Sequence, residues 1–290
     1  MKTFDARVRD RVKTMATLRA LYLRVTVVDN VNQFARWFDQ RMRALHPGRA
    51  WESESRNKWR KNFCGDVSMT EESRSFLREL FPDGRFYVAT AGSASGKGFE
   101  YADNGLDEGE CDEVSLMSSP ADCLYRFGPG RLWSALWDGE SGSNQLWQLY
   151  HATGAYAESW GDAGKIDALL EVLRQKLDDA ERFDPNAVQL EDLGRAVVIY
   201  RQMLRDELPD VSLAIESYVT VHRALLACRC CLRLLNVYDD VRKFITHMES
   251  ERIASNPRYV DALRYWYHRS ELFGVDAHID NPINCEYMCL

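Results

Sequence analysis

Residues 91–98 read AGSASGKG, an order close to that of a phosphate-binding loop. Such a loop, G-x-x-x-x-G-K-[ST], cradles phosphates with its backbone N–H groups and holds Mg²⁺ through its final hydroxyl. Here Ala91 replaces the first glycine, and Gly98 replaces the residue that carries the hydroxyl. The residues after Gly98 are acidic and lack a helical period, which opposes a bound phosphate. The pattern therefore indicates a loop of small residues rather than a nucleotidase or kinase site.

Cysteines in two closely spaced pairs are the candidate metal ligands, namely Cys228, Cys231, Cys285 and Cys289. Members three or four positions apart share one side of a helix, and four thiolates can bind zinc tetrahedrally. Structural zinc sites commonly place one pair on a tight turn, whereas CRCC (228–231) is predicted to lie inside a helix. Small buried thiols in a helical core are the simpler interpretation, and no metal or other cofactor is expected.

The other ionisable residues give no positive support for an enzyme. The six histidines show no H-E-x-x-H spacing, and no G-x-S-x-G elbow is present. Asp178 and Asp179 are adjacent, as are Asp239 and Asp240, so the members of each pair point in different directions on a helix. An enzyme whose site is assembled from distant residues is left as a third alternative.

Charge is divided unequally along the chain, which has a formal net charge of −7. Residues 1–61 hold 15 Lys and Arg against 6 Asp and Glu, whereas residues 62–290 hold 22 against 38. A basic segment on an acidic chain favours a polyanion, or an acidic surface of the same or another protein, as its partner. The simpler alternative is that RVRDRVK near the N-terminus forms the solvated face of a helix.

Residues 56–80 hold the main candidate binding site. The basic sequence RNKWRKN is followed by a glycine-led turn and by a helix with spaced leucines. This stretch resembles the second half of a helix-turn-helix of the Cro or phage-repressor type. The matching positions are Trp59, Gly65, Ser68, Phe76, Leu77 and Leu80. The resemblance implies that five residues face DNA, namely Arg56, Asn57, Lys58, Arg60 and Lys61.

The resemblance covers about 25 of the 290 residues and departs from the family pattern in two ways. The preceding segment is too long for the tight first helix and turn of the motif. Met69 also stands where proline is frequent. A structural helix pair that does not contact DNA is the alternative interpretation of the same residues.

Helical periodicity at both ends of the chain predicts a mainly α fold. Residues 1–84 are expected to form a basic, helix-turn-helix-like region. One helix is expected after an N-cap at Asp29 or Asn30, and a second is expected over ESRNKWRKNF (54–63) until Cys64 and Gly65. A third is expected after a cap at Ser68 or Thr70.

The rest of the chain divides into two further predicted domains. Residues 85–162 form an acidic, Gly- and Trp-rich middle segment with many loops and a little β structure at RFYVAT (85–90). Residues 163–290 form an antiparallel helical bundle, because four or more amphipathic segments follow one another with short connections. One long helical stretch is expected over about 210–255, interrupted once.

Composition excludes some classes of protein. No apolar run approaches the roughly 20 residues that a membrane helix needs. The first residues are charged and lack a signal-peptide pattern, so we expect an intracellular, cytoplasmic protein with reduced thiols.

These observations together favour a non-enzymatic nucleic-acid-binding or regulatory protein. Its N-terminal region would bind DNA, and its C-terminal bundle would mediate assembly, including homo-oligomerisation. The alternative is a protein–protein adaptor or structural subunit whose basic face meets an acidic protein partner. A further hypothesis is that residues 100–140, with 10 Asp and Glu against two Arg, occupy the basic surface when DNA is absent.

Overall fold

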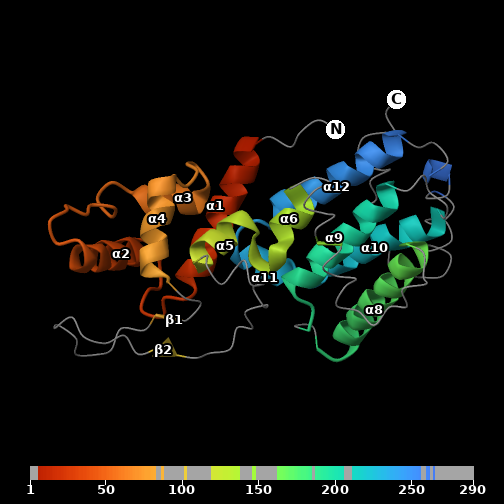
Figure 1. Cartoon of the computed structure of the whole chain (residues 1–290), viewed down its shortest axis with the longest axis horizontal. Coiled ribbons are helices and arrows are strands. Elements are labelled where there is room, and N and C mark those ends of the chain that lie inside the picture. Colours follow the sequence, from red (N-terminus) through yellow and green to blue (C-terminus); the bar gives the residue numbers. More distant parts are fainter. Residues whose placement is uncertain are drawn as a thin grey trace. The chain divides into compact units, whose positions relative to one another are not determined.

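The computed structural model describes residues 6–82, 86–87, 101–102, 119–137, 146–147, 162–184, 187–205, 211–255, 259–261 and 264. The protein is mainly helical, as the sequence predicts (Figure 1). The chain divides into two compact units. The N-terminal unit comprises Thr3–Pro129 and Arg233–Val237, and the C-terminal unit mainly comprises Gly130–Leu232 and Tyr238–Leu290. The domain boundaries at 84 and 162 stay a prediction, since much of the segment between them lies outside the described residues.

The N-terminal unit is built on α1 (Ala6–Tyr22), α2 (Val31–Leu45), α3 (Lys58–Cys64), α4 (Glu71–Leu80) and α5 (Pro120–Arg126). Helix α1 packs against α3 and α5, and α4 packs against α2 and α5. Because α1 has several neighbours, it buries hydroxyls as well as apolar side chains. The Thr14 hydroxyl donates to the Asp10 carbonyl at 2.8 Å and accepts from the Met69 N–H at 2.9 Å. This pair of bonds ties the turn before α4 to α1.

Aromatic side chains form the centre of the N-terminal core. Trp59 on α3 is fully buried, and its ring centroid lies 4.7 Å from that of Phe38 and 6.0 Å from that of Phe34. Edge-to-face aromatic pairs of this kind each add about 0.5–1.5 kcal/mol beyond the burial of their area. Trp59, one of the positions that carry the helix-turn-helix resemblance, is therefore a core residue.

Several predicted helix ends are confirmed. Asn30 caps α2 by accepting from the Gln33 N–H at 3.0 Å, and Thr70 caps α4 by accepting from the Ser73 N–H at 3.2 Å. Gly65 ends α3 with φ 77°, in the left-handed region that glycine adopts without strain. Short polar side chains and glycine at these positions supply partners and geometry that the helix ends lack.

The predicted helix over 54–63 begins later than expected, because residues 53–57 form a turn. The buried Asp39 carboxylate of α2 accepts from the Ser53 N–H at 3.0 Å and from the Glu54 N–H at 3.2 Å. These two bonds hold the chain in a turn, and α3 starts only at Lys58. A local sequence pattern cannot show an acceptor that lies 14 residues away.

The C-terminal unit is built on α6 (Leu132–Trp137), α8 (Asp162–Arg182), α9 (Leu190–Arg205), α10 (Val211–Ala227) and α12 (Tyr238–Ser255). Helix α9 packs against α6, α8 and α10. The predicted apolar face of α8 is confirmed, since Ile166, Leu170 and Leu177 are buried. The antiparallel order of these helices stays a prediction.

The long helical stretch predicted over 210–255 is interrupted twice rather than once. The first break is at Cys228, between α10 and α11 (Arg229–Leu234). The second separates α11 from α12, and Asn236 there has φ 60°. Asparagine is one of the few residues that tolerate the left-handed region, which explains why the helix stops at this point.

Strand structure among the described residues is confined to β1 (Phe86–Tyr87) and β2 (Tyr101–Ala102), which pair antiparallel. Strand β1 lies within the segment predicted as a strand. Among the residues that the structure describes, no helix combines the length and the apolar composition that a membrane-spanning segment requires.

Candidate nucleic-acid interface

Two of the five residues expected to face DNA precede α3 instead of lying on it. The exposed Arg56 guanidinium pairs with the Glu52 carboxylate at 3.0 Å. Asn57 occupies the N-cap position of α3 with φ 51°, and its side chain makes no capping hydrogen bond. Arg56 is therefore paired with the Glu52 carboxylate, whereas the exposed Asn57 side chain makes no hydrogen bond to the helix.

The three cations on α3 differ in their surroundings. Lys58 is half-buried, with its Nζ 5.1 Å from the Trp59 ring centroid and 5.7 Å from that of Phe76. Burial lowers the pKa of Lys58, while the nearby Glu72 carboxylate acts in the opposite direction. Arg60 and Lys61 are exposed and form no ion pair with a described residue. Of the five predicted residues, these two are the cations that a ligand can reach without displacing a carboxylate.

The connection between α3 and α4 comprises the six residues 65–70. A helix-turn-helix usually joins its helices by three or four residues. This length is a further departure from the family pattern, and the helix-turn-helix resemblance stays a prediction.

A second basic surface surrounds a cavity of about 500 Å³ in the N-terminal unit, here called the basic pocket. Its wall contains side chains from α1, α4 and α5. The cations are Arg9, Lys13, Arg74, Arg78 and Arg126. The carboxylates in the wall are those of Asp10 and Asp122. Positive charge on the wall of this pocket therefore exceeds negative charge by three, and the Glu71 carboxylate, which pairs with both Arg74 and Arg78, reduces this excess to two.

Helical spacing explains why the cations of α1 and of α4 face the basic pocket in pairs. Arg9 and Lys13 are four residues apart on α1, and Arg74 and Arg78 are four apart on α4, so each pair lies on one side of its helix. Because the wall combines three helices that are distant in sequence, the basic pocket could not be predicted from any one segment. The segment RVRDRVK is recognisably basic in the sequence, whereas the cations of α4 and α5 give no sign that they share a surface with it.

Packing restrains several of the cations in the basic pocket. The Arg74 guanidinium lies 4.4 Å from the Tyr125 ring centroid, and burial raises the pKa of Tyr125. Arg78 contacts the Asp122 carboxylate at 3.3 Å and also pairs with Glu71. Such contacts reduce the freedom that the side chains would lose on binding a ligand.

Arg126 differs from its neighbours in the basic pocket. Its side chain is exposed, lies over the Phe127 ring at 4.9 Å, and pairs with no carboxylate of the described residues. The Arg126 backbone carbonyl accepts a hydrogen bond from the Lys13 ammonium at 3.4 Å. An anion in the pocket would therefore meet at least one guanidinium whose charge is not offset.

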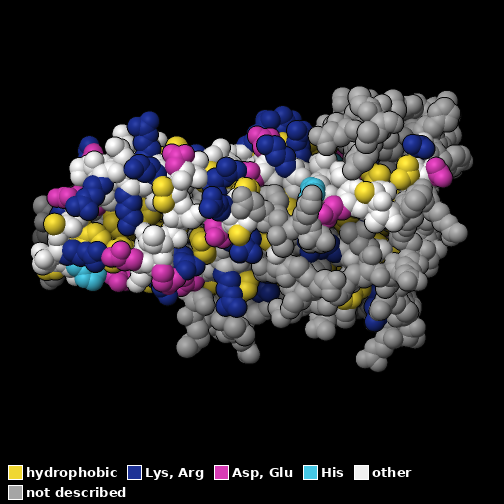
Figure 2. Space-filling model, turned by 90° about the horizontal axis from the view of Figure 1, so that it is seen from above, with side chains coloured by type: hydrophobic (Ala, Val, Ile, Leu, Met, Phe, Trp, Pro, Cys, Tyr) yellow, Lys and Arg dark blue, Asp and Glu magenta, His cyan; other side chains and the backbone are white. Residues whose placement is uncertain are grey.

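The arrangement of charge over the N-terminal unit is mixed (Figure 2). Lys and Arg side chains occur at intervals across the visible face of its helices, with Asp and Glu side chains between several of them. Ion pairs join several cations of this unit to carboxylates, including Arg36 with Glu54 at 2.7 Å. The excess of cations in residues 1–61 is therefore distributed over the unit, and of that segment Arg9 and Lys13 line the basic pocket.

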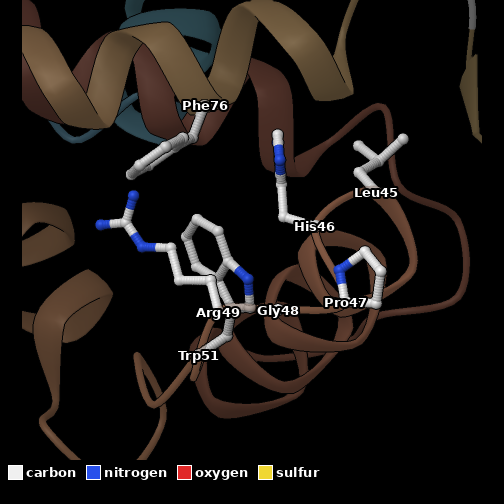
Figure 3. A pocket seen from close by; sticks show the side chains of 7 residues that line it. All are labelled: Leu45, His46, Pro47, Gly48, Arg49, Trp51 and Phe76. Carbon is white, nitrogen blue, oxygen red and sulfur yellow. The ribbon is translucent and has the colours of Figure 1, made fainter.

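An aromatic hollow of about 390 Å³ lies between the end of α2 and α4 (Figure 3). The Arg49 guanidinium lies over the rings of Trp51 and Phe76, at 4.7 and 4.9 Å from their centroids. Glu72 pairs with Arg49 at 2.7 Å, and the ring of His46 contacts Glu79 at 2.6 Å. Because each basic group here has a carboxylate partner, the aromatic hollow has no excess positive charge and is a poorer anion site than the basic pocket.

The two candidate zinc ligands that the structure describes differ in exposure. Cys228 is buried and donates to the Gln189 carbonyl at 3.3 Å, and burial raises its pKa to about 12. Cys231 is exposed, so the prediction of a buried thiol is confirmed for Cys228 and wrong for Cys231. Cys285 and Cys289 lie outside the described residues, as do residues 91–98. Within the described part of the chain, no three His, Cys, Asp or Glu side chains are grouped for metal binding.

No family model, curated protein or solved structure matches this chain. The chemistry of the two basic surfaces is therefore the basis on which a function can be proposed.

Proposed function

We propose that the N-terminal unit binds nucleic acid through its phosphates, and that the protein is a non-enzymatic nucleic-acid-binding or regulatory protein. The observation that carries the proposal is the basic pocket, in which side chains from three helices place five cations against two carboxylates. Phosphate contacts by Lys and Arg supply most of the sequence-independent affinity of proteins for nucleic acids.

The exposed cations of α3 support the same function. Arg60 and Lys61 make no ion pair with a described residue. The buried side chain of the preceding residue, Trp59, anchors the helix in the core. A rigid helix edge with unpaired cations is suited to phosphate contact. We propose that α3 and the basic pocket both contact the ligand, with Asn57 available for a base edge.

The C-terminal unit is proposed to mediate assembly. On α8, Val172 is 55% exposed, and Phe183, directly after the helix, is 80% exposed. These residues are eleven positions apart, which is close to three helical turns, so they lie on the same side. Large apolar side chains on one side of a surface helix favour a protein contact there. Sedimentation of the wild type and of Phe183→Glu tests this role, and an unchanged molecular mass would contradict it.

The test of nucleic-acid binding is a salt series of fluorescence anisotropy with labelled duplex and single-stranded DNA. The logarithm of the affinity should fall linearly with the logarithm of the salt concentration, with a slope of about −0.9 for each phosphate contact on a duplex. Replacing Arg9, Lys13 and Arg126 together by Gln should reduce the magnitude of this slope by about 2–3. The double variant Arg60→Glu, Lys61→Glu should weaken binding further.

The matched control is Lys243→Glu, which reverses an exposed charge on α12 of the C-terminal unit. It should leave both affinity and slope unchanged. Thermal unfolding of each variant shows whether the fold is retained. If the wild type binds neither form of DNA at low salt, the proposal is wrong, and the adaptor hypothesis with an acidic protein partner takes its place.

A further inference from the structure

We infer that the basic pocket binds the terminal phosphate of a nucleic-acid strand, an inference that rests on the proposed function. A terminal phosphate is a phosphomonoester, which has a charge of about −1.5 to −2 at neutral pH and three acceptor oxygens. A phosphodiester within the strand has a single negative charge. The two groups therefore place different demands on a binding site.

The charge of the basic pocket matches the monoester better. Five cations and two carboxylates line a single cavity, and the Glu71 carboxylate offsets one further charge, so the remaining excess of two positive charges balances a dianion. The cations also come from three helices and therefore surround the cavity from several directions. A tetrahedral group with three free oxygens can accept from several directions at once, whereas an internal phosphate has two of its four oxygens in ester bonds.

The size of the cavity supports a strand end. Its volume of about 500 Å³ is within the range of small-ligand sites, roughly 300–1,000 Å³. Such a space accommodates one nucleotide but not a duplex. The rings of Tyr125 and Phe127 line the same cavity and offer apolar surface to the terminal sugar and base. The chemistry of the wall thus fits a phosphate attached to a nucleoside at the end of a strand.

Arg126 is the residue on which the inference depends most. Its guanidinium is exposed and has no carboxylate partner among the described residues, whereas Arg78 already contacts Asp122 and Glu71. A guanidinium can donate two parallel hydrogen bonds to one phosphate, which makes Arg126 the expected bidentate donor. Arg126→Lys keeps the charge but removes this geometry.

The test compares short single-stranded DNA with a 5′-phosphate, a 3′-phosphate or no terminal phosphate, at one salt concentration. We expect one phosphorylated form to bind about tenfold more tightly than the unphosphorylated strand, as charge-assisted, bidentate bonds would provide. Arg126→Gln should reduce this preference to less than about twofold, and should weaken binding of the unphosphorylated strand only by the loss of one phosphate contact. Arg126→Lys should give an intermediate preference, and Arg36→Gln, which removes a surface cation paired with Glu54, should preserve it.

The outcomes separate this inference from the proposed function. Equal affinity for all three strands, with salt-dependent binding retained, overturns the terminal-phosphate assignment and leaves nucleic-acid binding in place. Absence of binding to any strand overturns both. A nucleoside monophosphate or inorganic phosphate that competes as well as the phosphorylated strand would assign the basic pocket to a free phosphate ligand and overturn the assignment to strand ends.

Discussion

The Tyr259 hydroxyl donates a 2.6 Å hydrogen bond to the carboxylate of Glu249 inside the C-terminal unit. The Tyr200 hydroxyl donates to the other carboxylate oxygen. The side chain of Arg252 is 3% exposed, and its guanidinium carbon lies 3.7 Å from the Tyr259 ring centroid. A guanidinium nitrogen of Arg252 lies 3.9 Å from a carboxylate oxygen of Glu249. A buried charge pair is thus held mainly by two tyrosines that are far apart in sequence.

Glu249→Ala should strongly destabilise the C-terminal unit. The substitution removes the acceptor of two tyrosine hydroxyls and the counter-charge of Arg252. Removing one partner of a buried ion pair costs about 3–5 kcal/mol, which urea unfolding followed by circular dichroism measures directly. The matched control is Glu251→Ala on the same helix, whose carboxylate pairs with the half-exposed His247 and should change stability by less than about 1 kcal/mol. Equal effects of the two substitutions would contradict a structural role for the buried pair.

The stability of the C-terminal unit should decrease as the pH rises and Glu249 loses its proton. Burial raises the pKa of this carboxyl above its ordinary value of 4.5, although Arg252 and the two tyrosines act in the opposite direction. A group with a raised folded-state pKa contributes its full stability below its ordinary pKa and loses it as pH rises through the folded-state pKa. The wild type and Glu249→Gln, whose amide replaces the neutral carboxyl, should therefore be closest in stability in acid, and the wild type should become progressively less stable than the variant as pH rises through the folded-state pKa. A wild type that instead gains stability relative to the variant as pH rises would show that the carboxylate is stabilised in its charged form.

Gly65→Ala should destabilise the N-terminal unit. Gly65 has φ 77°, and a Cβ atom there would lie 2.5 Å from Arg11 Cγ and 2.8 Å from Met15 Sδ. Backbone strain of this kind costs about 1–3 kcal/mol, to which the displacement of buried Met15 adds. Gly48→Ala is the control, because a Cβ atom at Gly48 meets nothing within 4 Å. Thermal unfolding should show a lower midpoint for Gly65→Ala, and a loss of the same size in Gly48→Ala would exclude a specific role for Gly65.

The sequence predicted those features that depend on neighbouring residues. Asn30 and Thr70 were each one of two cap candidates, beside Asp29 and Ser68, because a cap acts on backbone groups only three positions away. Gly65 was likewise recognised as a stop, since the left-handed conformation is a property of one residue. The mainly helical fold followed from apolar periodicity, which likewise depends on residues three or four positions apart.

Features that depend on distant residues were missed. The turn at residues 53–57 is held by Asp39, and a carboxylate on an earlier helix leaves no mark in the pattern of the turn itself. The basic pocket combines α1, α4 and α5, so the cations of α4 and α5 gave no signal of a shared surface. Glu249 and Arg252 similarly have the sequence pattern of surface residues, although both are buried.

The cysteines should differ in reactivity toward a thiol reagent. Burial raises the pKa of Cys228 to about 12, so almost none of it is thiolate at neutral pH, and its side chain is also inaccessible. Cys64 and Cys230 are exposed. Iodoacetamide labelling of the native protein, read by peptide mass spectrometry, should therefore modify Cys64 and Cys230 well before Cys228, which becomes reactive on unfolding. Labelling of native Cys228 at the same rate would show that α10 and α11 open readily at this position.

Asp122→Asn should strengthen nucleic-acid binding if the basic pocket is a phosphate site. Asp122 belongs to the acidic stretch 100–140, and its carboxylate contacts Arg78 at 3.3 Å, so it competes with a ligand for this guanidinium. Removing one negative charge from the wall should tighten binding about three- to tenfold at low salt, and less at high salt where charges are screened. Asp29→Asn is the matched control, because it changes the net charge equally at an exposed position directly before the N-cap of α2. Anisotropy titrations of both variants at two salt concentrations decide the matter. If both variants bind more tightly by the same factor, net charge alone is responsible; if neither does, Asp122 does not restrain the pocket.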